Sequence, residues 1–171
     1  MEERKPFEIY RASDQLDYAE HQIQRMVDPP PAALEALGDF ATEGGASGQH
    51  VTLAYARPGI SLTRVWFKSG YPLPLHSHSG ECCYFILAGS IRFGTEELGP
   101  GDGFFVGHDV PYTYEIGPNG VEVLEFRSTD DLDIRFQARN RQAWDKIVGR
   151  LRERSSDWET ELPPSQVKAH G

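Results

Sequence analysis

The chain has 171 residues, of which 39% are hydrophobic and 25% are charged, and its formal net charge is −9. A chain of this length can bury a sizeable core as one domain. The negative charge disfavours general nucleic-acid binding, because phosphates would repel the protein. We therefore expect small molecules as partners. No apolar run approaches the roughly 20 residues of a membrane span, so we expect no membrane association.

The two cysteines, Cys82 and Cys83, are adjacent in the sequence. On a strand their side chains point to opposite faces, so a disulfide between them would be strained. Free thiols are typical of a reducing compartment. The first residues, MEERK, are followed by no apolar segment of the kind found in a secretory signal. We therefore expect a cytoplasmic protein.

Residues 13–27 carry apolar side chains at helical spacing and stop before three consecutive prolines. This pattern predicts a helix followed by a stiff turn. Residues 32–37 predict a short second turn of helix, and the glycine-rich residues 44–48 predict a flexible connection. We interpret residues 1–47 as an N-terminal helical arm that packs outside the sheets or across a homodimer.

Residues 48–130 alternate short strand patterns with turns that contain Gly and Pro. The predicted strands are eight in number and span 50–57, 60–68, 74–79, 82–88, 90–95, 103–106, 111–116 and 121–128. So many short strands at this spacing are typical of a jelly roll. The predicted fold class is therefore all-β.

Residues 131–171 predict a C-terminal helix and a tail. Within residues 140–154, Trp144, Val148 and Leu151 lie on one helical stripe, which favours docking of the helix on a sheet or a partner chain. The other face is rich in Arg and Lys, and we interpret it as a solvated face rather than as an anion-binding patch.

His76 and His78 lie one residue apart after a turn rich in Gly and Pro. On a strand, residues i and i+2 share a face, so the two imidazoles converge. Neutral imidazole is the commonest metal ligand, and two of them supply half of a first coordination shell. The pair predicts a metal site. The alternative is two strand histidines that are exposed or hydrogen-bonded.

This stretch resembles the first motif of the cupin superfamily, G-x5-H-x-H-x3,4-E-x6-G, with Gly70 and Gly89 as its glycines. Residues 101–112 resemble the second motif, G-x5-P-x-G-x2-H-x3-N. The resemblance spans roughly residues 48–128. It implies a cupin double-stranded β-helix (jelly roll), here with an N-terminal helical arm and a C-terminal helix. It also implies the chemistry of cupin dioxygenases, isomerases and lyases as a group.

The ligand positions that this resemblance implies are only partly kept. Cys82 stands where cupins usually carry the metal-binding Glu, Glu81 lies one residue earlier, and Tyr112 stands at the position of the second-motif His. Glu81 and Cys82 face opposite sides of a strand unless a bulge intervenes, so either can be the third ligand. His108 is a further candidate for the third imidazole ligand. Tyr112 can ligate the ion, act as an acid/base, or simply line the barrel.

The identity of the ion stays open at this point. Two histidines with Glu81 suit non-haem Fe(II) and also accommodate Zn or Mn, whereas a Cys82 thiolate favours Zn or Cu. We predict a divalent ion (Fe, Zn, Mn, Ni or Cu) that polarises a carbonyl or enolate or, as Fe or Cu, binds O2. Tyr112 is then the catalytic residue, as an acid/base or as the group that orients the substrate.

The predicted pocket lies around His76 and His78, and its candidate substrate-binding residues are Arg64, Trp66, Tyr84, Phe104 and Tyr114. Arg64 can hold a carboxylate or enolate through paired hydrogen bonds. The leading hypothesis is a mononuclear metal-dependent enzyme acting on a small oxygenated organic molecule. The alternative is a non-catalytic small-molecule-binding cupin that has lost the metal. A third interpretation gives Cys82 a function, as a thiolate ligand or in a thioether link to a tyrosine.

Overall fold

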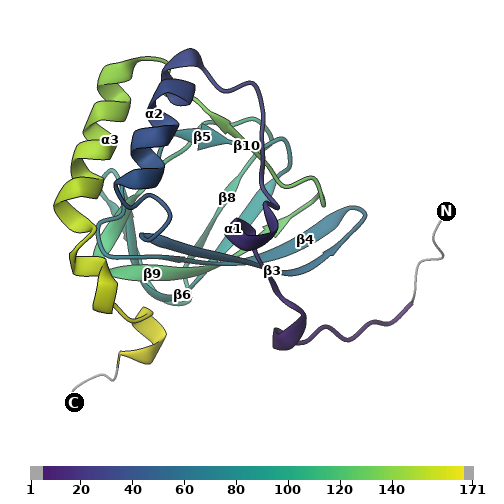
Figure 1. Cartoon of the computed structure of the whole chain (residues 1–171). Helices are drawn as coiled ribbons and strands as arrows, with labels where there is room; N and C mark the ends of the chain where they lie inside the picture. The colour runs from purple at the N-terminus through teal and green to yellow at the C-terminus, as the bar shows by residue number, and fades with distance from the viewer. Residues whose placement is uncertain (1–5, 168–171) are drawn as a thin grey trace.

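A computed structural model describes residues 6–167 as two facing β-sheets with two helices packed along one side (Figure 1). The helices are α2 (Pro31–Thr42) and α3 (Arg141–Arg154), which lie side by side. The sheets supply the architecture of the molecule, so the prediction of an all-β jelly roll is confirmed.

The larger sheet has the strand order β1-β3-β4-β9-β6-β7, with β8 paired to β6. Its strands are β1 (Leu16–Asp17), β3 (Gln49–Arg57), β4 (Ile60–Phe67), β9 (Glu115–Arg127), β6 (Cys82–Phe93), β7 (Glu96–Leu98) and β8 (Gly103–Val106). The smaller sheet has the order β2-β10-β5, with β2 (Arg25–Met26), β10 (Asp133–Phe136) and β5 (His76–Ser77).

The two sheets do not join into a closed barrel within residues 6–167, which corrects the predicted barrel. One reason lies in β5, where the predicted strand 74–79 shortens to two residues. Pro72 and Pro74 have no N–H to give to a ladder, so regular pairing begins only at His76. On its other side, His76 forms a single antiparallel bridge with Tyr112, which belongs to no strand.

Two predicted turns lie inside long strands instead. The predicted strands 82–88 and 90–95 form one strand, β6, and the Gly-Pro-Asn-Gly sequence at 117–120 is part of β9. The register between β6 and β9 shifts twice, between Ile86 and Ala88 and between Gly89 and Ile91. Gly89 has a positive φ of 78°, and a Cβ there would lie 2.1 Å from the carbonyl oxygen of Gly120. The glycine-containing sequences that predicted turns therefore form irregularities inside the strands, and the strands continue past them.

The predicted helix over residues 13–27 is wrong. In its place the chain forms a 3-10 turn (Ala12–Asp14), β1, the single-turn helix α1 (Tyr18–His21) and β2. The Asp17 side chain caps α1 by accepting hydrogen bonds from the N–H groups of Ala19 and Glu20. Gln22 then adopts a left-handed φ of 50°, which ends the helix. Pairing of β1 with β3 and of β2 with β10 outweighs the helical pattern.

The two longer helices fit their sequence patterns better. Helix α2 continues to Thr42, beyond the predicted residues 32–37, and α3 agrees with the predicted helix over 140–154. Asn140 caps α3 by accepting a hydrogen bond from the N–H of Ala143 at 2.9 Å. Trp144 is fully buried between the helices and donates from Nε1 to the carbonyl of Ala138.

The chain after α3 returns to the larger sheet. Two 3-10 turns, Asp157–Thr160 and Pro164–Gln166, carry it along the sheet. Trp158 is fully buried and donates from Nε1 to the carbonyl of Ser69 at 3.0 Å. Within residues 6–167 no helix is both long and apolar enough to cross a membrane.

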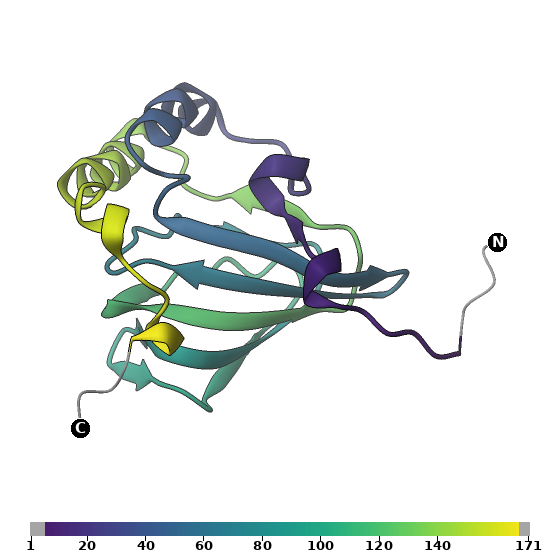
Figure 2. The same cartoon turned by 60° about the horizontal axis from the view of Figure 1, so that its bottom comes forward.

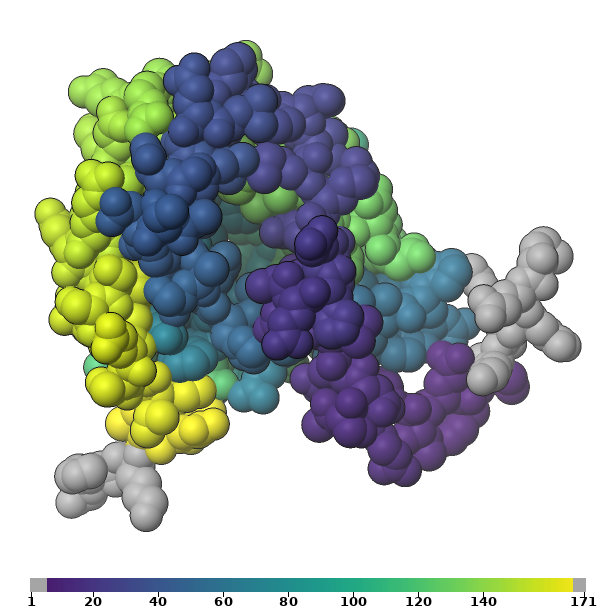
Figure 3. Space-filling view, viewed as in Figure 1, coloured from purple at the N-terminus to yellow at the C-terminus, as the bar shows by residue number. Residues whose placement is uncertain are grey.

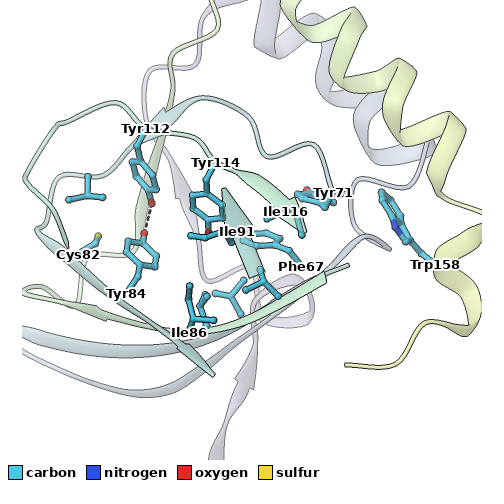
Figure 4. Close-up of a cluster of buried hydrophobic side chains, with 14 of the residues drawn as sticks. Phe67, Tyr71, Cys82, Tyr84, Ile86, Ile91, Tyr112, Tyr114, Ile116 and Trp158 are labelled. Atoms are coloured by element: carbon cyan, nitrogen blue, oxygen red, sulfur yellow. Dashed lines mark hydrogen bonds between the residues drawn. The ribbon is translucent and has the colours of Figure 1, made fainter. Parts of the chain in front are cut away.

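The core between the sheets is rich in tyrosine. Alternation along β6 turns Cys82, Tyr84 and Ile86 inward, and all three are buried. Tyr112 and Tyr114 approach from the opposite side, and the hydroxyls of Tyr84 and Tyr112 point toward each other (Figure 4). One end of the apolar core is therefore lined with polar atoms.

Replacing Trp144 tests how far the helical pair stabilises the fold. Trp144→Ala removes a fully buried indole and is expected to lower the free energy of unfolding by about 3–5 kcal/mol. Leu34→Ala is the matched control on α2, because Leu34 is 58% exposed and its loss should change the free energy by less than about 0.5 kcal/mol. Urea unfolding followed by circular dichroism measures both. Equal effects of the two substitutions would contradict the packing described here.

Candidate functional site

A cavity of about 100 Å³ lies between the two sheets. Its polar wall consists of His76, His78, Tyr84, Tyr112, Tyr114, Glu125 and Arg127. Aromatic rings from Phe67, Tyr71 and Phe136 form part of the rest, and Tyr18 and Gln24 from the N-terminal segment also line the cavity. In the space-filling view the N-terminal segment and α2 flank a hollow on this side of the molecule (Figure 3).

Backbone carbonyls fix the tautomers of both histidines. Nδ1 of His76 lies 2.7 Å from the carbonyl oxygen of Pro74, and Nδ1 of His78 lies 2.6 Å from that of Asp133. A carbonyl oxygen only accepts, so each Nδ1 carries the proton and each Nε2 keeps its lone pair. The two rings are 4.9 Å apart and nearly perpendicular. Both residues therefore offer the wall of the cavity a hydrogen-bond acceptor.

A chain of hydrogen bonds connects His78 with the opposite sheet. Nε2 of His78 lies 3.1 Å from the hydroxyl of Tyr112, which bonds to the hydroxyl of Tyr84. Tyr84 in turn donates to Oε1 of Glu125 at 2.8 Å. When Tyr84 donates to Glu125, its oxygen accepts from Tyr112. When Tyr84 turns its proton to Tyr112 instead, Tyr112 is free to donate to His78. The chain thus has two proton arrangements.

Arg127 closes this network with three of its N–H groups. Nε donates to Oε1 of Glu125 at 2.7 Å, Nη1 to the carbonyl of Asp133 at 3.2 Å, and Nη2 contacts Nε2 of His78 at 3.4 Å. The side chains of Glu125 and Arg127 are 6% and 2% exposed. A fully ionised pair at this depth depends on further hydrogen bonds, and here Oε1 of Glu125 also accepts from Tyr84 while Arg127 also donates to the carbonyl of Asp133.

Burial and the ion pair set the protonation states. Burial and the nearby His78 lower the pKa of His76 to about 3, and burial with the Arg127 cation lowers that of His78, so both imidazoles are neutral. Burial opposes ionisation of Glu125, but Arg127 outweighs it and brings the carboxyl pKa to about 2. Burial raises the pKa of the Tyr112 hydroxyl well above its usual value, so Tyr112 is a protonated donor near neutrality.

Several polar side-chain atoms of the cavity wall have no hydrogen bond within residues 6–167. Among them are Nε2 of His76, the hydroxyl of Tyr114 and Oε2 of Glu125. None of these three atoms is fully enclosed by protein, so each is accessible from the cavity. Because polar groups inside proteins are almost always hydrogen-bonded, these atoms are places where a ligand or water can bond.

Five of the predicted site residues come together here: His76, His78, Tyr84, Tyr112 and Tyr114 all line the cavity. Arg64 and Trp66 do not, because they alternate with the inward-facing Val65 and lie on the outer face of β4. Arg64 pairs there with Glu122 at 2.6 Å. The prediction that these two residues contact a substrate in this cavity is corrected by the register of the strand.

The other predicted residues lie near the site but outside the cavity. The Phe104 ring stacks on that of Tyr84 at 4.4 Å, behind the wall. Glu81 is exposed, because β6 begins at Cys82 and no bulge turns Glu81 inward. Cys82 is buried with its Sγ 3.6 Å from the carbonyl of Gly80, and burial raises its pKa to about 12, so it is a thiol. His108 is exposed beside Asp109.

Glu125 and Arg127 are the site residues that the sequence analysis missed. A signal was present, since both continue the i, i+2 series of the fully buried Val121 and Val123 along β9. Two opposite charges at core positions of one strand indicate a buried pair. The pair was missed because the sequence of the predicted strand 121–128 does not reveal which of its two faces points into the core.

The donor atoms can be tested against the divalent ion that the cupin motifs imply. Both histidines fit, because each presents an Nε2 lone pair held by a carbonyl on Nδ1. The remaining donors do not fit. No cluster of three or more His, Cys, Asp or Glu side chains within residues 6–167 has the arrangement of a metal site. The Arg127 cation also contacts both His78 and Glu125, so an ion bound to those residues would meet a like charge.

Comparison with known proteins was made by sequence and by structure. No model of a known protein family matches the sequence, and no curated protein is significantly similar to it. The polyketide cyclase RemF from Streptomyces resistomycificus has a similar structure, with a TM-score of 0.56 and 16% identity over 86% of this chain and 96% of RemF. This likeness shows the fold.

Two further similar structures cover about half of the chain. An RmlC-like cupin from Shewanella frigidimarina has 20% identity and a TM-score of 0.45, over 49% of this chain and 78% of that protein. Oxalate decarboxylase from Bacillus subtilis has 18% identity and a TM-score of 0.44, over 48% of this chain and 26% of the decarboxylase. The chain shares the fold of RemF, and its two facing sheets agree with the jelly roll that the two sequence motifs predicted.

Disruption of the buried ion pair gives a direct test of the network. Arg127→Met and Glu125→Gln are each expected to lower the free energy of unfolding by about 3–5 kcal/mol, because each leaves a buried group without its partner. The double variant should lose much less than the sum of the two. The exposed pair Arg92–Glu115 is the control, and Arg92→Met should cost less than about 1 kcal/mol. Additive losses at Glu125 and Arg127 would contradict the network.

Proposed function

We propose that this protein binds a small hydroxylated organic molecule of about one ring in the cavity and performs acid–base chemistry on it. The observation that carries the proposal is that Nε2 of His76 and the hydroxyl of Tyr114 both belong to the cavity wall and both lack a hydrogen-bond partner. A neutral imidazole nitrogen accepts a hydrogen bond, and a phenol both donates and accepts. A ligand that matches them carries an O–H group for His76 and a second oxygen for Tyr114.

The size and walls of the cavity support a one-ring ligand. The cavity here measures about 100 Å³, which is smaller than the apolar cavity of about 150 Å³ known to hold benzene, so its size limits the ligand to one small ring. Rings of Phe67, Tyr71 and Phe136 offer apolar surface for a flat molecule. RemF is named a polyketide cyclase, and from that name we carry over to this protein only the general class of substrate, an oxygenated organic molecule.

Arg127 and Tyr112 supply the electrostatics and the proton in this proposal. The guanidinium is a permanent cation in a site of low dielectric, and it favours negative charge that develops on a ligand oxygen. Tyr112 lies between His78 and Tyr84, and its protonated hydroxyl can donate its proton to a ligand oxygen on which negative charge develops. The same proton returns to Tyr112 when that oxygen becomes a neutral carbonyl again, so Tyr112 acts as a general acid/base without a net loss of protons from the site.

A metal-dependent enzyme is the second candidate function. The observation in its favour is that both histidines present Nε2 lone pairs whose direction is fixed by carbonyls on Nδ1. A bound divalent ion would supply Lewis acidity toward a carbonyl or enolate. In either case we place the protein in a reducing, cytoplasmic compartment, since the thiol of Cys83 is exposed and free.

Binding of catechol and phenol tests the ligand class. Catechol offers two adjacent oxygens and is expected to bind more tightly than phenol. In Tyr114→Phe its affinity should fall about tenfold, the cost of roughly one lost hydrogen bond. Isothermal titration calorimetry measures the affinities, and Cys83→Ser is the control, because Cys83 lies on the outer face of β6. Absence of binding by both compounds, or no effect of Tyr114→Phe, would argue against this ligand class.

The acid–base step can be measured without knowing the natural substrate. Cyclohexanone in D2O exchanges its α-protons, and the protein is expected to accelerate this exchange, as followed by NMR. Tyr112→Phe should retain binding but lower the rate about 100-fold or more, since general acid–base groups typically contribute that much. Exchange no faster than in buffer, or a rate unchanged in Tyr112→Phe, would overturn the assigned role.

Elemental analysis separates the two candidate functions. For the metal-free proposal we expect no stoichiometric Fe, Zn, Mn, Ni or Cu in protein purified without an affinity tag, and no gain in melting temperature when these ions are added. A near-stoichiometric metal in the wild type that is lost in His76→Ala/His78→Ala would favour the metal-dependent candidate instead.

A further inference from the structure

A groove of about 790 Å³ lies between helix α3 and one end of the larger sheet. At this end β6 and β9 pair through Arg92 and Glu115, and Figure 2 shows α3 beside the ends of these strands. Tyr71, Leu73 and Tyr114 line both the groove and the cavity, so these side chains lie between the two spaces. The groove is therefore a neighbour of the cavity, and its volume is typical of small-molecule sites, which measure roughly 300–1,000 Å³.

The cations of α3 fall into two groups, which divides the basic face that was interpreted from the sequence as solvated. Arg141, Arg152 and Arg154 each form an ion pair with a nearby carboxylate. Lys146 and Arg150 form no ion pair within residues 6–167, and both line the groove. The helix therefore places its two unpaired cations in the same space.

These two cations lie one helical turn apart, at positions i and i+4 of α3. Like charges at this spacing destabilise a helix, whereas Arg141 and Asp145, which have the same spacing, form an ion pair. The chain as a whole has a net charge of −9, so positive charge gathered in one groove departs from its average composition. A cleft lined by charge of one sign focuses the field and raises the local concentration of counter-ions. The placement of Lys146 and Arg150 therefore indicates an anion site.

The rest of the lining defines the ligand further. Arg92 adds a third cation, but Glu115 neutralises it through an ion pair, and the other lining residues are uncharged. The groove therefore has a surplus of two positive charges, which a dianion balances. Leu73, Ile116 and Ile147 provide apolar surface beside these charges. A matching ligand joins a group with two negative charges to a small apolar body.

We propose that this groove binds a small dianion with an apolar body, such as a phosphate ester or a dicarboxylate, through Lys146 and Arg150. A guanidinium donates two parallel hydrogen bonds to a phosphate or carboxylate, and an ammonium adds a compact charge with three donors. Ile147, one residue after Lys146, lines the same groove and contacts the apolar body. The site is independent of the chemistry proposed for the cavity, because neither cation lines the cavity.

Calorimetric titration at low salt with phenyl phosphate and with phthalate tests this assignment, because each compound joins a dianion to one ring at about pH 8. Lys146→Gln and Arg150→Gln are each expected to weaken binding of the tighter probe about tenfold, the loss of roughly one charge-assisted hydrogen bond. Arg152→Gln is the matched control. It removes the same charge from the same helix outside the groove, so the affinity should change less than about twofold. Absence of binding by both probes, or an equal loss in the control, would overturn the proposal.

A variant that gains affinity does not depend on how well the other variants fold. Glu115→Gln removes the anion of the groove and frees Arg92, so the surplus rises by one positive charge. Binding of the tighter probe is expected to strengthen about fivefold, as one more opposite charge nearby would give in a solvated groove. Loss of structure cannot produce a gain of this kind. Unchanged or weaker binding in Glu115→Gln would count against the site.

The order of the affinities identifies the dianion. Tighter binding of phenyl phosphate assigns a phosphate ester, and tighter binding of phthalate assigns a dicarboxylate. Inorganic phosphate, which lacks the ring, is expected to bind about tenfold more weakly than the tighter aromatic probe. Equal binding of inorganic phosphate would contradict the apolar part of the ligand. Tyr112 lines the cavity and not the groove, so a loss of probe binding in Tyr112→Phe would place the probes in the cavity and overturn the proposal.

Discussion

The buried ion pair of Glu125 and Arg127 is the interaction on which the rest of the site depends. Arg127 lies on β9 of the larger sheet and donates to the carbonyl of Asp133 on β10 of the smaller one. The same carbonyl accepts from Nδ1 of His78. One peptide oxygen therefore holds the cation and the imidazole together, and the separation of the sheets is fixed by hydrogen bonds at the point where the cavity is polar.

This arrangement also explains why the cavity can be polar without being unstable. Both tyrosine hydroxyls, the imidazole of His78 and Oε1 of Glu125 have partners, so the low dielectric strengthens the bonds that are made. The cost of two buried charges is offset because Arg127 distributes its N–H groups over an anion, a carbonyl and an imidazole. The polar atoms without a partner, at His76, Tyr114 and Oε2 of Glu125, belong to residues that line the cavity.

Much of the fold could be predicted from the sequence, because periodicity, glycine turns and the two cupin motifs are local signals. His76, His78 and Tyr112 followed from the same motifs. Arg64 and Glu81 were misplaced for one reason: local pattern does not reveal strand register, and a shift of one residue exchanges the faces. The helix predicted over 13–27 failed because sheet pairing at both ends, which is not local, decided its backbone.

The pairing of β2 with β10 has a consequence for how the cavity is assembled. Arg25 and Met26 on β2 pair in parallel register with Asp133 and Ile134 on β10, more than 100 residues later in the chain. Contacts so distant in sequence form late in folding, because the entropy of closing a long loop must be paid before the contacts stabilise the chain. Gln24, which lines the cavity, sits directly before β2. The pocket should therefore be among the last parts of the molecule to become ordered during folding.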